Sequence, residues 1–198
     1  MDLNAITVFC GSRPGARPIY ADAARALAEA LAARHLGLVY GGASVGLMGV
    51  LADRAIALGV RTVGVIPEWL VEREIVHLAL TESIVTPNMH ARKQRMSDLA
   101  GGYVAMPGGY GTFDELFEVL TWAQIGLHRK PIGLLDVDGY FAPLLAMVDR
   151  GVTEGFIAKE HRALLHVHGD PGELLDAMAR AEPKDVGITK WEDARDRT

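Results

Sequence analysis

Two glycine-rich turns, each between a short apolar run and a helical pattern, place the strongest constraint on the fold of this chain. They occupy residues 41–49 and 106–112. Glycine lets the backbone adopt positive φ and lets another backbone or a ligand approach closely. A short apolar run bounded by turn residues is typical of a buried strand. The pattern therefore predicts that both turns lead from a strand into a helix and open on one edge of a parallel sheet.

The alternation of strands and helices continues along most of the chain. The expected strands cover residues 5–10, 36–40, 60–66, 82–86, 103–106, 132–135 and 163–167. The expected helices cover residues 19–34, 47–58, 113–127, 140–150 and 171–180, with a further helical pattern within 88–96. This order predicts a single-domain α/β fold, a Rossmann-like, doubly wound parallel sheet with helices on both faces. Ligands of such folds bind at the carboxyl edge of the sheet, near the point where the strand order reverses.

Length and composition limit the class of protein. The chain has 198 residues, which predicts one α/β domain over residues 1–180, followed by a polar tail, 181–198, that Trp191 could anchor. A net charge of −5 argues against a protein that binds nucleic acid through its overall field. The single cysteine, Cys10, cannot form an intrachain disulfide. Neither a secretory leader nor a run of 18 apolar residues is present, so we expect a cytoplasmic protein without membrane contact.

The turn at residues 106–112 predicts a phosphate site. Three glycines stand in four positions, and Thr112 is a favourable N-cap with Glu115 at the spacing of a capping box. Free amides at a helix N-terminus attract phosphate. The glycines alone fit a plain strand-to-helix turn about as well, but the strand before and the helix after them favour the phosphate site.

Two further places in the sequence carry candidate binding residues. Ser12 ends the first expected strand and could either reach a ligand or bond to its own backbone in the turn. On a helix, Arg92 and Lys93 share a face with the apolar Met89 and Met96. A cation on an apolar face is costly unless an anion meets it, although its side chain can also extend to water. The residues leave both alternatives open.

These motifs resemble those of the LOG family, the cytokinin riboside 5′-monophosphate phosphoribohydrolases. Residues 107–112 followed by Glu115 match the family motif PGGxGTxxE in full. A second signature is matched by residues 89–96, and residues 40–49 resemble a third, although Ala43 stands where the family often has a third glycine. At residues 100–102, Ala-Gly-Gly replaces a more usual Ser-Asp-Ala. The resemblance covers nearly the whole chain up to about residue 180.

The resemblance implies an enzyme that cleaves the N-glycosidic bond of an N6-substituted adenosine 5′-monophosphate, or of plain AMP, to the free base and ribose 5-phosphate. It implies that Arg92 and Glu115 form the catalytic pair. Together with the residues of the turns, the expected substrate-binding set is Ser12, Gly42, Glu74, Met89, Lys93, Gly108, Gly109, Tyr110, Gly111, Thr112 and Thr121. The chemistry fits, because a carboxylate stabilises the positive charge that develops on the sugar and can activate water. No metal or other cofactor is expected, since the histidines lack ligand spacing such as HExxH.

The resemblance also implies a homodimer, with apolar surface around Trp122, Ile125 and Leu127 for a symmetric contact. Two other functions remain open. The first is a non-catalytic carrier of a nucleotide or of the molybdenum cofactor, since such carriers have a similar fold and phosphate turn. The second is a pyridoxal-phosphate decarboxylase with Lys93 as the Schiff-base lysine, although no aspartate is identifiable as partner of the cofactor's ring nitrogen.

Overall fold

The computed structural model describes residues 3–71 and 76–182. It contains one sheet of seven strands, and every neighbouring pair is parallel. The strands are β1 (Ala5–Phe9), β2 (Gly37–Tyr40), β3 (Thr62–Pro67), β4 (Glu82–Thr86), β5 (Gly102–Ala105), β6 (Ile132–Leu135) and β7 (Leu165–His168). Their order across the sheet is β4-β3-β2-β1-β5-β6-β7.

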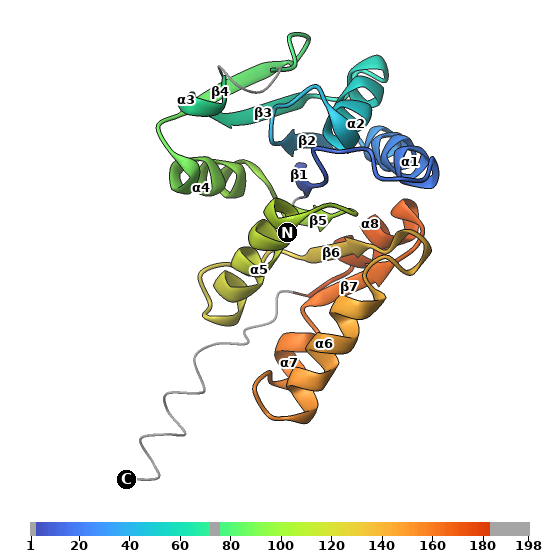
Figure 1. Ribbon diagram of the computed structural model, residues 1–198, viewed down its shortest axis with the longest axis vertical. Coiled ribbons are helices and arrows are strands. Elements are labelled where there is room, and N and C mark those ends of the chain that lie inside the picture. Colours follow the sequence, from blue (N-terminus) through green and yellow to red (C-terminus); the bar gives the residue numbers. More distant parts are fainter. Residues whose placement is uncertain (1–2, 72–75, 183–198) are drawn as a thin grey trace.

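Helices cover both faces of the sheet (Figure 1). One face packs against α1 (Ile19–Ala33), α2 (Gly46–Ala57) and α8 (Pro171–Ala179). The other face packs against α4 (Met89–Leu99), α5 (Tyr110–Gln124) and α6 (Ala142–Thr153). Three short elements complete the described parts, namely α3 (Glu68–Val71), the 3-10 turn η1 (Val137–Gly139) and α7 (Lys159–Arg162). The expected doubly wound α/β fold is therefore confirmed.

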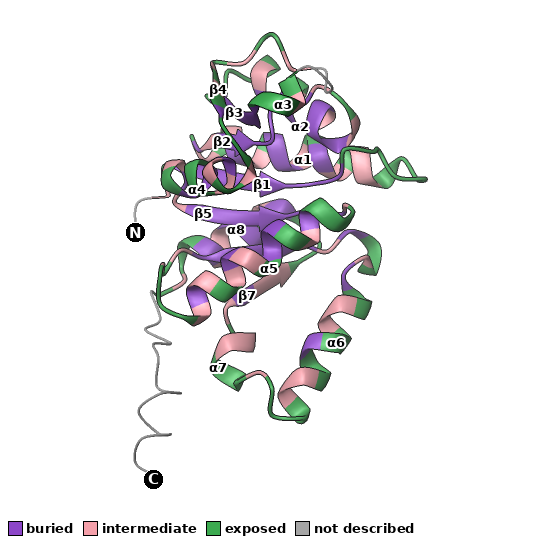
Figure 2. Cartoon of the chain, turned by 60° about the vertical axis from the view of Figure 1, so that its left-hand side comes forward, coloured by how far each residue is buried: buried purple, intermediate pink, exposed green. Residues whose placement is uncertain are grey.

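The core lies between the sheet and these two layers of helices (Figure 2). All residues of β1 are buried, as expected for a central parallel strand that is covered on both faces. Leu27 and Leu31, one turn apart on α1, are completely buried beneath it. Burying one leucine side chain contributes about 1.5–3 kcal/mol. Cys10, at the end of β1, is part of the same core.

The strand order reverses between β1 and β5, and this point brings separate turns together. The chain passes from β1 outward to β4, then returns to the other side of β1 to form β5. The amide of Gly11, after β1, donates to the carbonyl of Pro107, after β5, at 3.1 Å. The amide of Leu47, after β2, donates to the carbonyl of Gly11 at 3.0 Å. Three turns at the carboxyl edge of the sheet are thus bonded to one another, where ligands of this fold bind.

The structure differs from the sequence-based expectations in a few places. The third strand begins at Thr62, two residues late, and includes Pro67. The single turn of α7 was not expected, because Lys-Glu-His-Arg carries no apolar periodicity. The domain boundary at residue 180 stays a prediction, since Trp191 and the rest of residues 183–198 lie outside the described part. Within the described residues, no helix has both the length and the hydropathy of a membrane span.

Candidate active site

The glycine turn after β5 leads directly into α5. The helix begins at Tyr110, with Gly109 as its N-cap, and no side chain caps it. The expected capping box is therefore wrong, because Thr112 and Glu115 both lie inside the helix. The first amides of a helix have no partner within it. The amides of Tyr110, Gly111 and Thr112 thus form an uncapped N-terminus beside the turn, a favourable place for an anion.

The three glycines of this turn differ in how much space surrounds them. A Cβ added at Gly108 would lie 2.1 Å from Oγ1 of Thr112 and 2.9 Å from the amide nitrogen of Gly11. Gly108 therefore permits the close packing of the turn. A Cβ at Gly109 or Gly111 would meet nothing within 4 Å. Packing therefore does not require glycine at these two positions, and each leaves open space next to the helix N-terminus.

Arg92 and Glu115 form a buried ion pair between α4 and α5. Nη1 of Arg92 lies 2.7 Å from Oε1 of Glu115, and the two residues are 9% and 8% exposed. Nε of Arg92 donates to the carbonyl of Val65, on β3, at 2.9 Å. A Cβ at Gly41 would lie 2.5 Å from Nη2 of Arg92, so the glycine turn after β2 makes room for the guanidinium. The cation of α4 is thus met by an anion, which decides between the two alternatives left open for Arg92.

Burial and charge act in opposite directions on Glu115. Burial raises the pKa of its carboxyl, while the charge and hydrogen bond of Arg92 lower it, and the net direction is upward. Removing one partner of a buried ion pair costs about 3–5 kcal/mol, because the other charge remains unpaired. The pair is therefore held in place by its own electrostatics.

Lys93 lies beside this pair with its own acidic partners. Its Nζ lies 2.9 Å from Oε1 of Glu118 and 3.2 Å from Oδ2 of Asp114, and its side chain is 12% exposed. Burial lowers the pKa of Lys93, but the bonds to Glu118 and Asp114 outweigh burial and leave this pKa above the ordinary lysine value. A Schiff-base lysine needs the opposite, an amine that readily loses its proton. The geometry therefore disfavours the pyridoxal-phosphate interpretation.

A cavity of about 570 Å³ adjoins the glycine turn on its α1 side. Its lining residues are Gly11, Ser12, Arg13, Gly15, Tyr20, Leu47, Pro107, Gly108, Gly109, Tyr110 and Tyr140. The volume lies within the usual range of small-molecule sites. Sequence reasoning did not single out Tyr20 or Tyr140 as site residues. The position of Tyr140, just after β6 at the same edge of the sheet, is the signal that could have identified it.

The remaining predicted residues are placed differently. Gly42 is buried with φ of +82°, and its carbonyl accepts a hydrogen bond from the amide of His77 at 3.0 Å. Met89 is the half-buried first residue of α4. Thr121 is exposed, and its hydroxyl donates to the carbonyl of Phe117 at 2.7 Å. It does not line the cavity beside the turn. Glu74 lies outside the described residues.

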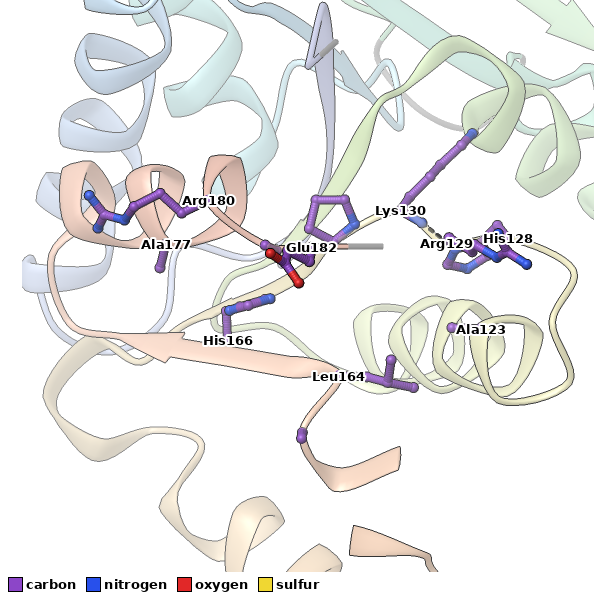
Figure 3. A pocket seen from close by; sticks show the side chains of 12 residues that line it. Ala123, His128, Arg129, Lys130, Leu164, His166, Ala177, Arg180 and Glu182 are labelled. Atoms are coloured by element: carbon purple, nitrogen blue, oxygen red, sulfur yellow. Dashed lines mark hydrogen bonds between the residues drawn. The ribbon is translucent and has the colours of Figure 1, made fainter. Parts of the chain in front are cut away.

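A second cavity, of about 230 Å³, lies at the opposite edge of the sheet (Figure 3). Several basic residues line it, and two of them, His128 and Lys130, bond to groups of the protein itself. Lys130 extends from the cavity to the carbonyl of Ser97 on α4, at 2.6 Å. The ring of His128 contacts the carbonyl of Val119 at 2.9 Å and accepts a hydrogen bond from the amide of Lys130 at 3.1 Å. Among residues 3–71 and 76–182, no cluster of His, Cys, Asp or Glu could hold a metal ion. The edge with Arg92 and Glu115 is therefore the candidate active site.

Comparison with known proteins agrees with this fold. A solved structure of the molybdenum cofactor binding protein from Rippkaea orientalis has a TM-score of 0.68 at 21% identity, covering 90% of this chain and 98% of the other. At that identity the likeness shows the fold alone.

Similarity in sequence is closer and more specific. The profile of a family described as "Possible lysine decarboxylase" matches residues 48–178. A cytokinin riboside 5′-monophosphate phosphoribohydrolase of Arabidopsis thaliana is 45% identical over 184 residues, 93% of this chain and 85% of the relative. A second Arabidopsis thaliana protein of the same name is 43% identical over 194 residues, 96% of this chain and 91% of the relative. With identity of this extent over nearly its whole length, the chain belongs to the LOG family.

Proposed function

We propose that this protein is a phosphoribohydrolase that cleaves the N-glycosidic bond of adenosine 5′-monophosphate or of an N6-substituted derivative. Water adds its hydroxyl to C1′ of the ribose and its proton to the base, which gives ribose 5-phosphate and the free base. One structural observation carries the proposal: the buried pair of Arg92 and Glu115 lies close to the uncapped N-terminus of α5. The names of the relatives that are 43–45% identical support the same reaction.

Each part of the site has a proposed role. The turn from Gly108 to Thr112 binds the 5′-phosphate through backbone amides. Ionised Glu115 stabilises the positive charge that develops on the ribose and orients the attacking water. Arg92 favours the ionised form of Glu115, since its charge opposes the upward shift that burial gives the carboxyl pKa. No step in this scheme requires a metal or another cofactor.

The proposed substrate contacts extend beyond this centre. Ser12 lines the cavity, and Lys93 adjoins the ion pair. Gly42 and Met89 belong to neighbouring elements at the same edge of the sheet. Glu74 and Thr121 are assigned from the family resemblance alone.

We further propose a homodimer built on α5 and the turn that follows it. Phe117, Ile125 and Leu127 are 41%, 46% and 68% exposed. The apolar type and the spacing of these residues would also be typical of a buried core. Trp122, by contrast, is half-buried against the core of its own chain and contributes less surface. A symmetric contact would cover this apolar surface. The proposed compartment is the cytoplasm, supported by the single cysteine, and the net charge of −5 speaks against a nucleic-acid partner.

The test is product analysis with a panel of nucleotides. The protein is incubated with AMP, an N6-alkylated AMP, and the two corresponding nucleosides without phosphate. Chromatography should detect free base and ribose 5-phosphate from the monophosphates only. Release of no base from any monophosphate would leave the carrier function as the better interpretation. Equal turnover of adenosine and AMP would contradict the phosphate role of the glycine turn.

A further inference from the structure

The hydroxyl of Tyr140 is bonded to the glycine turn in front of α5. Tyr140 follows η1, in the connection from β6 to α6. Because β6 pairs with β5, this connection lies beside the turn that follows β5. The hydroxyl of Tyr140 donates a hydrogen bond to the carbonyl oxygen of Gly108. A residue more than two elements away in the chain thus contacts the proposed phosphate site.

Packing of the Tyr140 ring fixes the direction of its hydroxyl. The ring of Tyr140 packs edge-on against Tyr20, with centroids 6.0 Å apart, and against Phe141, with centroids 5.1 Å apart. Phe141 is completely buried, and its amide donates to Oδ1 of Asp136 at 2.7 Å. The amide of Tyr140 donates to the carbonyl of Val137 at 3.1 Å, so the backbone is bonded on both sides of the ring, and the side chain is held between two rings.

The bond to Gly108 determines the direction of the next amide. The carbonyl of Gly108 and the N–H of Gly109 belong to one trans peptide, so they point in opposite directions. Glycines flank this peptide on both sides, and glycine restricts its rotation less than any other residue. Gly109 is the N-cap of α5 but has no side chain to hold the turn. A bond from outside the turn therefore selects the orientation of this peptide.

Orientation matters because an amide hydrogen attracts an anion, whereas a carbonyl oxygen repels it. We propose that Tyr140 is a positioning residue that fixes the Gly108–Gly109 peptide in the orientation with which the glycine turn binds the 5′-phosphate of the substrate. The inference rests on the proposed phosphate site. Tyr140 bonds to the turn and takes no part in the reacting bond, so it acts on the affinity for phosphorylated ligands. The rate of bond cleavage in the bound complex should not depend on it.

The variant Tyr140→Phe keeps the ring and removes only the hydroxyl. Steady-state kinetics with AMP should show KM raised about fivefold, the effect of one lost hydrogen bond. An interaction made equally in ground state and transition state changes KM and leaves kcat almost constant. The Kd for ribose 5-phosphate, measured by calorimetry, should rise by the same factor. The matched control is Tyr103→Phe, which loses a buried hydroxyl bonded to Ser97 at 2.6 Å and should change neither constant.

The two readouts separate this inference from the proposed reaction. Unchanged KM and Kd in Tyr140→Phe, with AMP hydrolysis intact in the wild type, would overturn the inference alone. A lower kcat at constant KM together with a lower Tm would also overturn it, because that signature reports a smaller folded fraction. If the wild type binds ribose 5-phosphate but releases no base, the hydrolase proposal fails while the Kd still tests Tyr140. If the wild type does not bind ribose 5-phosphate, the phosphate site and the inference fail together.

Discussion

Arg92 and Glu115 meet across two helices, with Nη1 and Oε1 2.7 Å apart, although they lie 23 positions apart in the chain. Arg92 also bonds to the carbonyl of Val65 on β3. One side chain thus connects α4, α5 and the sheet. The carboxylate of Glu115 is held at the carboxyl edge of the sheet by Arg92, whose charge also lowers the pKa that burial raises. This dual dependence underlies the first two predictions.

Replacing Glu115 by Gln should lower kcat by roughly 10²-fold or more, the scale of a group that stabilises developing charge or activates water. The change should also lower the free energy of unfolding by up to about 3 kcal/mol, because Arg92 keeps a neutral acceptor but loses its counter-charge. Turnover of AMP and Tm measure the two effects. Asp114→Asn, one residue away and exposed, is the control and should retain most activity. Normal turnover in folded Glu115→Gln protein would remove Glu115 from the mechanism.

Lys93→Gln should move the acidic limb of the kcat/KM profile to higher pH. Burial raises the pKa of Glu115, and the charges of Arg92 and Lys93 lower it. Without the charge of Lys93 the pKa rises further. Because the ionised carboxylate is the proposed active form, activity is lost at a higher pH as the solution is acidified. The phosphate of AMP titrates equally with both enzymes, so the difference between the two profiles reports the enzyme. A limb that stays in place or moves to lower pH would contradict this coupling.

Replacing Gly108 or Gly111 by alanine should distinguish a glycine that the packing requires from one that leaves room for a ligand. In Gly108→Ala the new Cβ meets Oγ1 of Thr112 at 2.1 Å, which should cost about 1–3 kcal/mol of stability. In Gly111→Ala the Cβ meets nothing within 4 Å, and helix propensity should stabilise the fold by up to about 1 kcal/mol. If phosphate occupies that open space, Gly111→Ala should nevertheless raise KM for AMP. Thermal melting and kinetics of both variants check this. A Gly111→Ala enzyme with wild-type KM would place the phosphate elsewhere.

A charge on the exposed apolar surface formed by α5 and the turn after it should weaken the proposed dimer. Leu127→Asp introduces a carboxylate where a symmetric contact would bury it without a partner, which is unfavourable. Sedimentation at micromolar concentration should give a dimer for the wild type and a shift toward monomer for Leu127→Asp. Met147→Asp is the matched control, since Met147 is 74% exposed and belongs to a different helix, α6. A wild type that sediments only as monomer would refute the assembly.

The sequence was sufficient for the fold because nearly every strand is an apolar run that ends in a turn. The start of α5 was mispredicted for a physical reason. Thr112 and Glu115 have the spacing of a capping box, but the helix starts earlier, at Tyr110, and the carboxylate of Glu115 faces Arg92. Local spacing could not reveal this competition, because the partner comes from another helix.

The packing of Arg92 shows the same limit of prediction from local sequence. Its position on an apolar face indicated a need for an anion, yet phosphate and Glu115 both satisfied that need. Only the arrangement of α4 and α5 over the sheet selects Glu115. The contact between Tyr140 and Gly108 likewise depends on β6 lying next to β5, which no local pattern states.

The order of the strands divides the proposed catalytic residues between two lengths of chain. The first length runs from β1 to the end of α4 and includes Arg92. Residues 100 and 101 then connect it to β5, which pairs with β1. Glu115 and the glycine turn belong to the second length, from β5 onward. A nascent chain that ends after the first length contains Arg92 and four of the seven strands of the described sheet, but neither Glu115 nor the glycine turn. Under the proposed mechanism the ion pair and the phosphate turn exist together only once α5 has been made and has packed against α4, so we expect no activity from a chain that stops before α5.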